Sequence, residues 1–401
     1  MPIRTTPFHE RTSALNGTGL WSHWSGHLAV EKYQLSEKAE YVSVRNAAGI
    51  SDVSPLFKYR FSGPGAERFL AGVLARDPRP LQPGEAHYAL WCDDRGFLVE
   101  DGVLLRHGPD AFVLTAAEPN LAYFEDLVGP RDRVVIEDIS PDWAVLALQG
   151  PRSRGLLAGL DDRIGRLAYF GHGPATIAGH AVNVSRTGFT GDLGYEVWCR
   201  AEDALDVWDA VWAATRGHGV VPFGLQALYM TRIEAGLLLL DVDFANSRFA
   251  WTDADRATPV ELGLGWALRD VPTTDRAFIG RDALRRELRD GTSRFRATGI
   301  VVDYADWNRH HEAAGLMPVF DHVPVQEEQY LYDDDGTQIG VCTSFLYSPV
   351  LQRHIGMARV PVALAAPGNR VNLEIPVSHR YVHVAATTAR LPHFNPQRKT
   401  A

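Results

Sequence analysis

The chain has 401 residues, of which 40 are basic and 49 acidic, so its formal net charge is −9. With 45% hydrophobic and 22% charged residues, it can bury a sizeable core, which excludes an intrinsically disordered chain. The acidic balance and the lack of basic runs argue against nucleic acid as a partner. The length predicts two or three domains.

The sequence carries no feature of a secreted or membrane-bound protein. The amino-terminal residues lack an apolar signal segment, and the longest purely aliphatic stretch, Leu237 to Leu240, is far too short to cross a bilayer. Three isolated cysteines argue against a disulfide framework and a cysteine-based metal site. Phosphate-loop, dinucleotide and hydrolase motifs are absent. We therefore expect a soluble, cytoplasmic protein without a metal or a membrane partner.

The predicted elements begin after about forty irregular residues. An alternating strand around residues 58–61 leads into a Ser-Gly-Pro-Gly turn at residues 62–65 and then an amphipathic helix. A buried strand at residues 144–148 is likewise followed by a Gln-Gly-Pro turn at residues 149–151 and a helix. These two matches suggest a duplicated strand–turn–helix unit, although two matches are weak evidence for a repeat.

The second half of the chain changes character along its length. Residues 195–199 alternate as a strand, and helical spacing predicts helices over 202–216 and 225–234. From about residue 290 onward, short strand-like runs are separated by turns, which predicts a mostly β carboxy-terminal domain. Strands and helices neither alternate strictly nor segregate, so the predicted class is α+β.

Four segments concentrate residues that a plain structural element would not need. The first is a glycine-laced turn that leads into a strand with an early acidic residue, and another places two adjacent carboxylates inside an apolar strand. The third segment places a charged pair at the end of a predicted helix, next to an apolar run. The fourth segment alternates glycines with apolar residues. The segments are residues 185–196, 96–102, 231–236 and 261–266.

At these residues the chain resembles the glycine-cleavage T-protein (aminomethyltransferase) family of tetrahydrofolate enzymes, which includes related tetrahydrofolate-dependent demethylases. The resemblance covers nearly the whole length, and its most specific parts are residues 187–196 and 232–236. The other matching segments are Arg4-Thr-Thr-Pro7, residues 44–54 and 146–151, Thr343-Ser-Phe345, Ser348-Pro349 and Leu391-Pro392.

The resemblance implies a three-domain cloverleaf around a central folate channel. Its first domain would combine residues 1–54 with 142–222, and its second would combine residues 55–141 with 223–275. Residues 276–401 would form the β-rich carboxy-terminal domain.

The resemblance also implies the residues that hold tetrahydrofolate. Glu196 takes the position of the family acid that accepts the two donors of the pterin edge, a geometry suited to a carboxylate in a closed channel. Phe189 stands where the family usually has Tyr, and Arg232 matches an arginine that lines the folate site. Tyr88 is a candidate channel wall. The alternatives are a solvated strand acid for Glu196, a helix salt bridge for Arg232 and a core aromatic for Tyr88.

Asp101 is the predicted catalytic residue. The family carries a pair of acids at this place, and here the pair is Glu100-Asp101. Adjacent residues of a strand point to opposite faces, so only one of the two acids can face a channel. A partly buried carboxylate close to the folate nitrogens could orient the donor and stabilise developing positive charge. The alternative is an acid of a hairpin at a sheet edge.

The chain departs from the glycine-cleavage enzyme on its substrate side. Pro55-Leu56 replaces a His-Met pair, and the segment after Gly236 is longer and aromatic. These differences favour a related demethylase that takes a methyl group from a small O-, N- or S-methylated substrate, and an aromatic ether would suit an aromatic pocket. The candidate substrate contacts are Trp24, Phe249 and Trp251, with packing in cores and loops as the alternative.

The sequence therefore predicts a tetrahydrofolate-dependent methyltransferase acting on a small methylated substrate. The alternative within the family is glycine-cleavage-type aminomethyl transfer producing 5,10-methylene-tetrahydrofolate, with a lipoyl carrier protein as partner. Two further alternatives are a non-catalytic folate-binding protein and a subunit that works in trans with a dehydrogenase subunit. Absence of a cysteine around residues 277–282 counts against the non-catalytic relatives.

Overall fold

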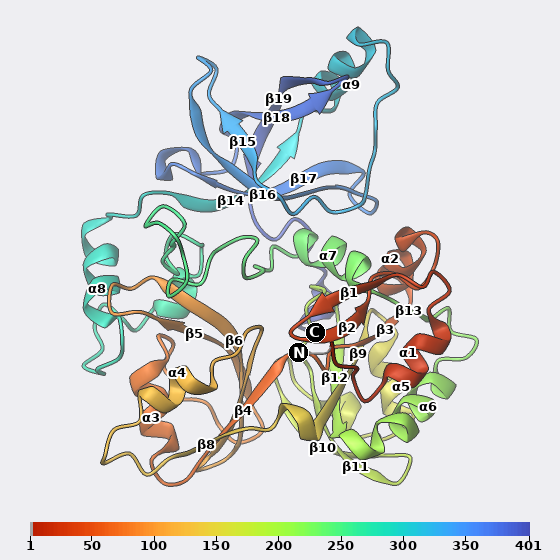
Figure 1. The fold of residues 1–401 in the computed structure, drawn as a ribbon, viewed down its shortest axis with the longest axis vertical. Helices are drawn as coiled ribbons and strands as arrows, with labels where there is room; N and C mark the ends of the chain where they lie inside the picture. Colours follow the sequence, from red (N-terminus) through yellow and green to blue (C-terminus); the bar gives the residue numbers. More distant parts are fainter. Residues whose placement is uncertain (1–2) are drawn as a thin grey trace.

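The computed structural model describes residues 3–401, whose larger sheets form three separate bodies (Figure 1). A six-stranded sheet and a five-stranded sheet lie side by side in the lower half of the view, and a closed six-stranded barrel lies above them. A hairpin of β1 (Trp21–Trp24) and β2 (His27–Val30) forms a small fourth sheet beside the six-stranded one.

The six-stranded sheet draws its strands from two distant parts of the chain. Its strand order is β10-β11-β12-β9-β3-β13, and only the β3–β13 pair is parallel. Apolar side chains of β9 and β12 pack against helices to make one core. The strands are β3 (Gly49–Asp52), β9 (Trp143–Gln149), β10 (His172–Ile177), β11 (His180–Ser185), β12 (Gly194–Arg200) and β13 (Val221–Pro222). The helices beside it are α1 (His9–Leu15), α2 (Glu37–Asn46), α5 (Ser153–Ala158) and α6 (Ala204–Ala214).

The five-stranded sheet is antiparallel and continuous in sequence. Its strand order is β5-β6-β7-β4-β8, and alternate aromatic residues of β4 enter a core under two short helices. The elements are β4 (Phe57–Ser62), α3 (Ala66–Val73), β5 (Ala86–Cys92), β6 (Leu98–Gly108), β7 (Ala111–Ala116), α4 (Leu121–Asp126) and β8 (Val135–Asp138).

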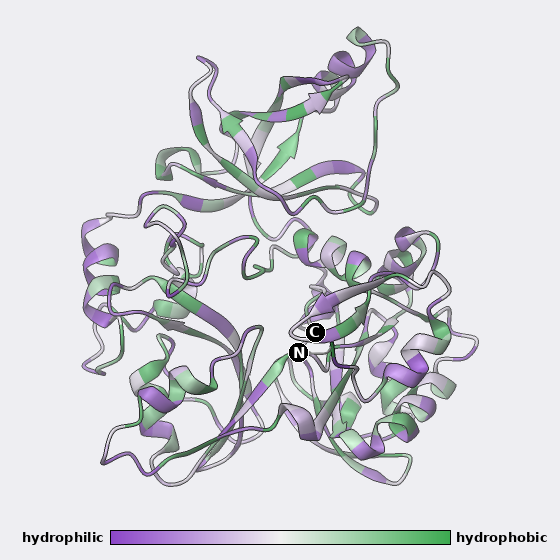
Figure 2. Cartoon of the chain, viewed as in Figure 1, coloured by the Kyte–Doolittle hydropathy of each residue, from purple (hydrophilic) through white to green (hydrophobic). Residues whose placement is uncertain are grey.

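The carboxy-terminal part confirms the predicted β-rich domain, because its six antiparallel strands close into a barrel. Helix α8 (Arg281–Asp290) precedes the barrel in sequence and is strongly hydrophilic (Figure 2). Helix α9 (Tyr304–Ala313) follows the first barrel strand. The barrel strands are β14 (Arg296–Val302), β15 (Gln329–Tyr332), β16 (Gln338–Ser348), β17 (Arg353–Val360), β18 (Arg370–Val377) and β19 (Arg380–Ala389).

Helix α7 (Leu225–Glu234) joins these bodies, and it spans the residues that helical spacing predicts. Nearly all of its side chains are buried, and it contacts both α2 and barrel strand β16. An apolar cluster around α7 reaches the five-stranded sheet and barrel strand β17. The observed mixture of helices and strands confirms the α+β class, whereas the three domain ranges stay a prediction.

One local expectation is wrong, and another is confirmed. The first forty residues are not irregular throughout, because they contain α1 and the β1–β2 hairpin. Both Gly-Pro turns do connect a strand to a helix, β4 to α3 and β9 to α5, and both Gly63 and Gly150 have positive φ. Within residues 3–401 no helix has the length and apolar character needed to cross a bilayer.

Candidate functional site

A cavity of about 470 Å³ lies between the six-stranded and five-stranded sheets. Its walls come from strands β4 to β7, strands β9 and β12, the glycine-laced turn before β12, and the segment after α7. The lining includes Glu196 on one sheet and Asp101 on the other. Two strand faces that the sequence places about a hundred residues apart thus meet in one space.

The glycine-laced turn has its shape because Gln149 fills its interior. The Gln149 side-chain amide donates to the carbonyl oxygens of Thr187 and Tyr195, at 3.1 and 3.2 Å. A Cβ atom added at Gly188 or Gly194 would lie 2.0 Å from the Gln149 side-chain oxygen. Larger residues at either position would displace this amide, so the glycines of the turn are required by packing.

Glu196 has one carboxylate oxygen held by the protein. The hydroxyl groups of Thr187 and Ser185 donate to Oε2, at 2.5 and 3.5 Å, and Oε1 accepts no hydrogen bond from residues 3–401. Burial raises the pKa of Glu196, while the two hydroxyls and the Lys58 ammonium oppose that rise. The carboxylate is therefore oriented from one side and open on the other, as a ligand-binding acid should be.

Lys58 of β4 is a charged cavity residue that the sequence analysis missed. Its side chain is 0% exposed, and its ammonium donates to the carbonyl oxygens of Ser54 and Leu56, at 2.8 and 2.7 Å. Burial lowers the pKa of Lys58 to about 8. Its position opposite the apolar face of β4 was visible in the alternation, but such a lysine ordinarily lies in solvent.

Asp101 lies against the phenol of Tyr88 on the neighbouring strand. Tyr88 donates a short hydrogen bond to Oδ2 of Asp101, and its ring stacks on Trp266 with 5.9 Å between centroids. Burial raises the pKa of Asp101 to about 6, although the Tyr88 hydrogen bond works in the opposite direction. A carboxyl group with this pKa exchanges protons close to neutral pH.

Glu100 points away from the cavity, which confirms the expected alternation of the acid pair. Its side chain is fully buried and accepts hydrogen bonds from the backbone amides of Ala117 and Glu118 and from Asn120. Burial raises the pKa of Glu100 to about 8. This first acid holds the loop after β7 in place, and the cavity receives the second acid alone.

The structure places Arg232 outside the cavity lining, in contrast to the expected folate contact. Its guanidinium is completely buried and donates to Asp243 at 2.6 Å and to Ser344 of the barrel at 2.8 Å. The alternative, in which Arg232 forms a structural salt bridge, agrees with the structure, although the partner comes from the loop after α7. Arg232 therefore joins α7 to the barrel.

The aromatic candidates separate into two groups. Trp24 and Phe189 line the cavity together with Tyr88. Phe249 and Trp251 lie outside it, with 69% and 97% of their surfaces exposed. The long loop carries these two residues to the surface, and their contact with a substrate stays a prediction.

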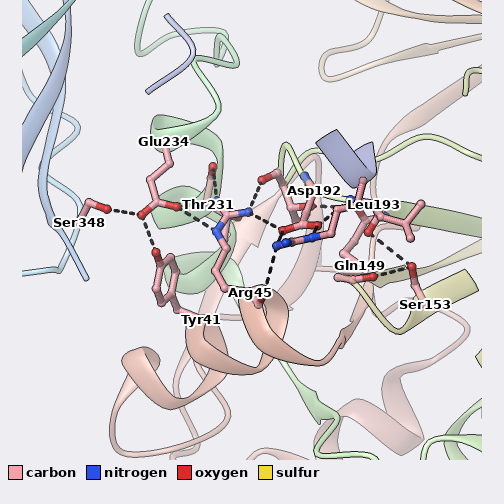
Figure 3. Close-up of polar contacts among 12 residues, drawn as sticks. Tyr41, Arg45, Gln149, Ser153, Asp192, Leu193, Thr231, Glu234 and Ser348 are labelled. Atoms are coloured by element: carbon pink, nitrogen blue, oxygen red, sulfur yellow. Dashed lines mark hydrogen bonds and ion pairs between the residues drawn. The ribbon is translucent and has the colours of Figure 1, made fainter. Parts of the chain in front are cut away.

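A buried polar network connects the cavity turn to the rest of the molecule (Figure 3). Arg45 of α2 donates to Glu234 of α7 at 2.6 Å and to the carbonyl oxygen of Thr190 in the turn at 2.9 Å. Asp192 of the same turn accepts two hydrogen bonds from Arg398, at 2.7 and 2.8 Å. The glycine-laced turn that precedes Glu196 is thereby fixed by α2 near the amino terminus and by Arg398 near the carboxy terminus.

Comparison with known proteins gives two domain matches. Residues 8–270 match the GCVT N-terminal domain, and residues 312–394 match the glycine cleavage T-protein C-terminal barrel domain. Together these matches cover the two sheets beside the cavity and most of the barrel.

Similar proteins extend over nearly the full length. An aminomethyltransferase of Geobacillus kaustophilus is 33% identical over 85% of this chain and 86% of its own. The heme-dependent oxidative N-demethylase gamma subunit of Ectopseudomonas mendocina is 32% identical over 99% of this chain and 97% of its own. The crystal structure of the glycine cleavage system aminomethyltransferase T from Bartonella henselae has the same fold, with a TM-score of 0.82, 24% identity and 98% coverage of both chains.

The domain matches, the full-length relatives and the shared fold agree with one another and with the resemblance seen in the sequence. The relatives named above include an aminomethyltransferase and a subunit of an oxidative N-demethylase. The chain is an enzyme that belongs to the glycine cleavage T-protein family.

Proposed function

We propose that the protein is a tetrahydrofolate-dependent one-carbon transferase that moves a methyl group from a small methylated substrate to the folate. The observation that carries the proposal is the pair of carboxylates, Glu196 and Asp101, on opposite walls of one cavity. One is open toward a ligand, and the other has a pKa of about 6. Binding and proton transfer are thus assigned to different groups.

The residues present fit a reduced pterin. A pterin edge offers a ring N–H and an amino group side by side, and the open Oε1 and the remaining lone pair of Oε2 of Glu196 can accept both. Phe189 and Trp24 supply flat apolar surface in the same cavity. Tetrahydrofolate bound there would supply a nucleophilic nitrogen for the one-carbon unit.

Asp101 would manage the proton of this reaction. Transfer of a methyl group from R–X–CH₃ leaves R–X, which must gain a proton, while the accepting folate nitrogen must lose one. The Asp101 carboxylate can hold that proton between the two events, because its pKa of about 6 allows both protonation states near neutral pH. Tyr88 fixes the orientation of the carboxylate by its hydrogen bond.

A product assay tests the proposal. The protein is incubated with tetrahydrofolate and a panel of small N-, O- and S-methylated compounds, and the folates are identified by mass spectrometry. Formation of 5-methyl-tetrahydrofolate from one donor class supports methyl transfer. Failure to bind tetrahydrofolate, measured by calorimetry, would exclude the whole proposal.

Similarity to the oxidative N-demethylase gamma subunit, over almost the entire chain, favours a second candidate. Here a companion dehydrogenase or oxidase subunit would oxidise a methylamine, and this chain would capture the one-carbon unit as 5,10-methylene-tetrahydrofolate. Similarity to the aminomethyltransferase supports the same product from a lipoyl-bound donor. The folate product separates these routes from methyl transfer, since both give the methylene form.

A further inference from the structure

Lys58 is a buried cation without a direct counter-ion. Strand alternation directs Tyr59 and Phe61 into the core of the five-stranded sheet and turns Lys58 to the other face. Two carbonyl oxygens hold its ammonium, yet within residues 3–401 no carboxylate forms an ion pair with it. Burying such a charge is costly, so its retention calls for a role.

Glu196 presents the complementary situation. Its protein partners are the neutral hydroxyls of Thr187 and Ser185, and no basic side chain among the described residues pairs with it directly. A buried carboxylate with only neutral donors tends to take up a proton. In its protonated form, it would lose one of the two acceptor sites that the pterin edge requires.

Lys58 and Glu196 line the same cavity from adjacent sheets, and the positive charge of one acts on the other. Coulomb interactions reach further in a poorly solvated interior than in water. The Lys58 ammonium is already held by two carbonyl oxygens, whereas Oε1 of Glu196 is open toward the cavity. We therefore assign the effect of Lys58 on a ligand to its action on Glu196.

We propose that Lys58 is a positioning residue that keeps the Glu196 carboxylate ionised, and hence able to accept both pterin donors. This inference rests on the proposed folate site. It predicts that the fixed ammonium on β4 sets the range of pH over which the cavity binds a reduced pterin.

Three other ionisable groups, on strands β3, β8 and β2, interact with Lys58. Asp52 of β3 and Asp138 of β8 interact with it electrostatically, as Glu196 of β12 does. Asp52 is already stabilised by the Thr6 hydroxyl and the Ser54 amide, at 2.5 and 2.9 Å. Burial lowers the pKa of His27 on β2, and the positive charge of Lys58 contributes to that lowering. None of these groups lines the cavity as Glu196 does.

The test is the pH profile of reduced-folate binding by the full chain, with 5-formyl-tetrahydrofolate as a stable probe. The variants are Lys58→Met, which removes the charge, and Lys58→Arg, which keeps a charge that cannot be neutralised in this range. Lys58→Met should move the acidic limb of binding upward by about one pH unit, because loss of a nearby cation raises a carboxyl pKa. Lys58→Arg should leave the acidic limb in place.

Lys58→Gln gives a second readout if Lys58→Met does not fold, because its amide can still donate to the two carbonyl oxygens but carries no charge. Its acidic limb should move upward as in Lys58→Met. Identical acidic limbs in the unmodified protein and in every variant would overturn the inference while leaving the folate site intact. No binding by the unmodified protein would instead overturn the proposed function.

Discussion

Glu196 and Asp101 occupy contrasting surroundings within the cavity. Glu196 lies beside two hydroxyls and within the field of a buried ammonium, whereas Asp101 has a phenol as its hydrogen-bond partner. Burial raises the pKa of both, but only Glu196 is opposed by a cation. The difference teaches that one cavity can hold a carboxylate whose ionised form is favoured by a nearby cation and a second carboxyl group without such a cation.

Replacing the binding acid should produce the largest effect. Glu196→Gln keeps the shape but lacks the charge and one acceptor, so we expect the affinity for tetrahydrofolate to fall about 100-fold. Calorimetric titration measures the change. Glu137→Gln, an exposed acid that pairs with Arg60 on the surface, is a matched control. Equal affinities for the Glu196 variant and the control would remove Glu196 from the site.

Asp101→Asn should separate catalysis from binding. We expect turnover to fall about 100-fold or more, with tetrahydrofolate affinity nearly unchanged, because the amide cannot exchange the proton. Single-turnover assays and calorimetry on the same preparation give the two numbers. Retained turnover would exclude the assigned role.

The same substitution makes a second prediction, on stability. Burial raises the folded-state pKa of Asp101 to about 6 from an ordinary value near 4, so the folded protein holds this proton more tightly than the unfolded chain. Ionisation therefore costs stability as pH rises through this range. Asp101→Asn should stabilise the free protein by about 1–2 kcal/mol at pH 7, and the gain should vanish below about pH 4. Denaturant unfolding at both pH values checks the sign.

Tyr88→Phe should sharpen the contrast between the two acids. The Tyr88 hydroxyl favours the ionised form of Asp101, so its removal raises the Asp101 pKa further. The acidic limb of the turnover profile should move up by about one pH unit, whereas the acidic limb of folate binding, which reports Glu196, should stay in place. Movement of both limbs together would contradict separate roles.

The smallest effect is expected outside the cavity. Trp251→Ala and Phe249→Ala should change kcat/KM by less than about twofold, because both rings lie on the surface. Trp24→Ala, within the cavity lining, should lower kcat/KM by about tenfold. Steady-state kinetics with the donor found in the product assay makes the comparison, and a large effect at Trp251 would restore the loop as a substrate contact.

The sequence predicts some of these features better than others, for physical reasons. The helix over 225–234 and the β-rich end follow from local periodicity, and the opposite directions of Glu100 and Asp101 follow from strand geometry. Partners of buried charges depend on tertiary packing. The pairing of Arg232 with Asp243 depends on where the loop after α7 folds, and the burial of Lys58 depends on the neighbouring sheet. Neither can be predicted from a local sequence pattern.

The network around the glycine-laced turn has a consequence for synthesis of the protein. Arg398 donates both to Asp192 and to the backbone carbonyl of Arg45, a residue 353 positions earlier. During synthesis, all strands of the six-stranded sheet leave the ribosome long before Arg398 can form these hydrogen bonds. A chain that ends within the barrel would therefore contain Glu196 yet lack one of the contacts that fix the turn before it.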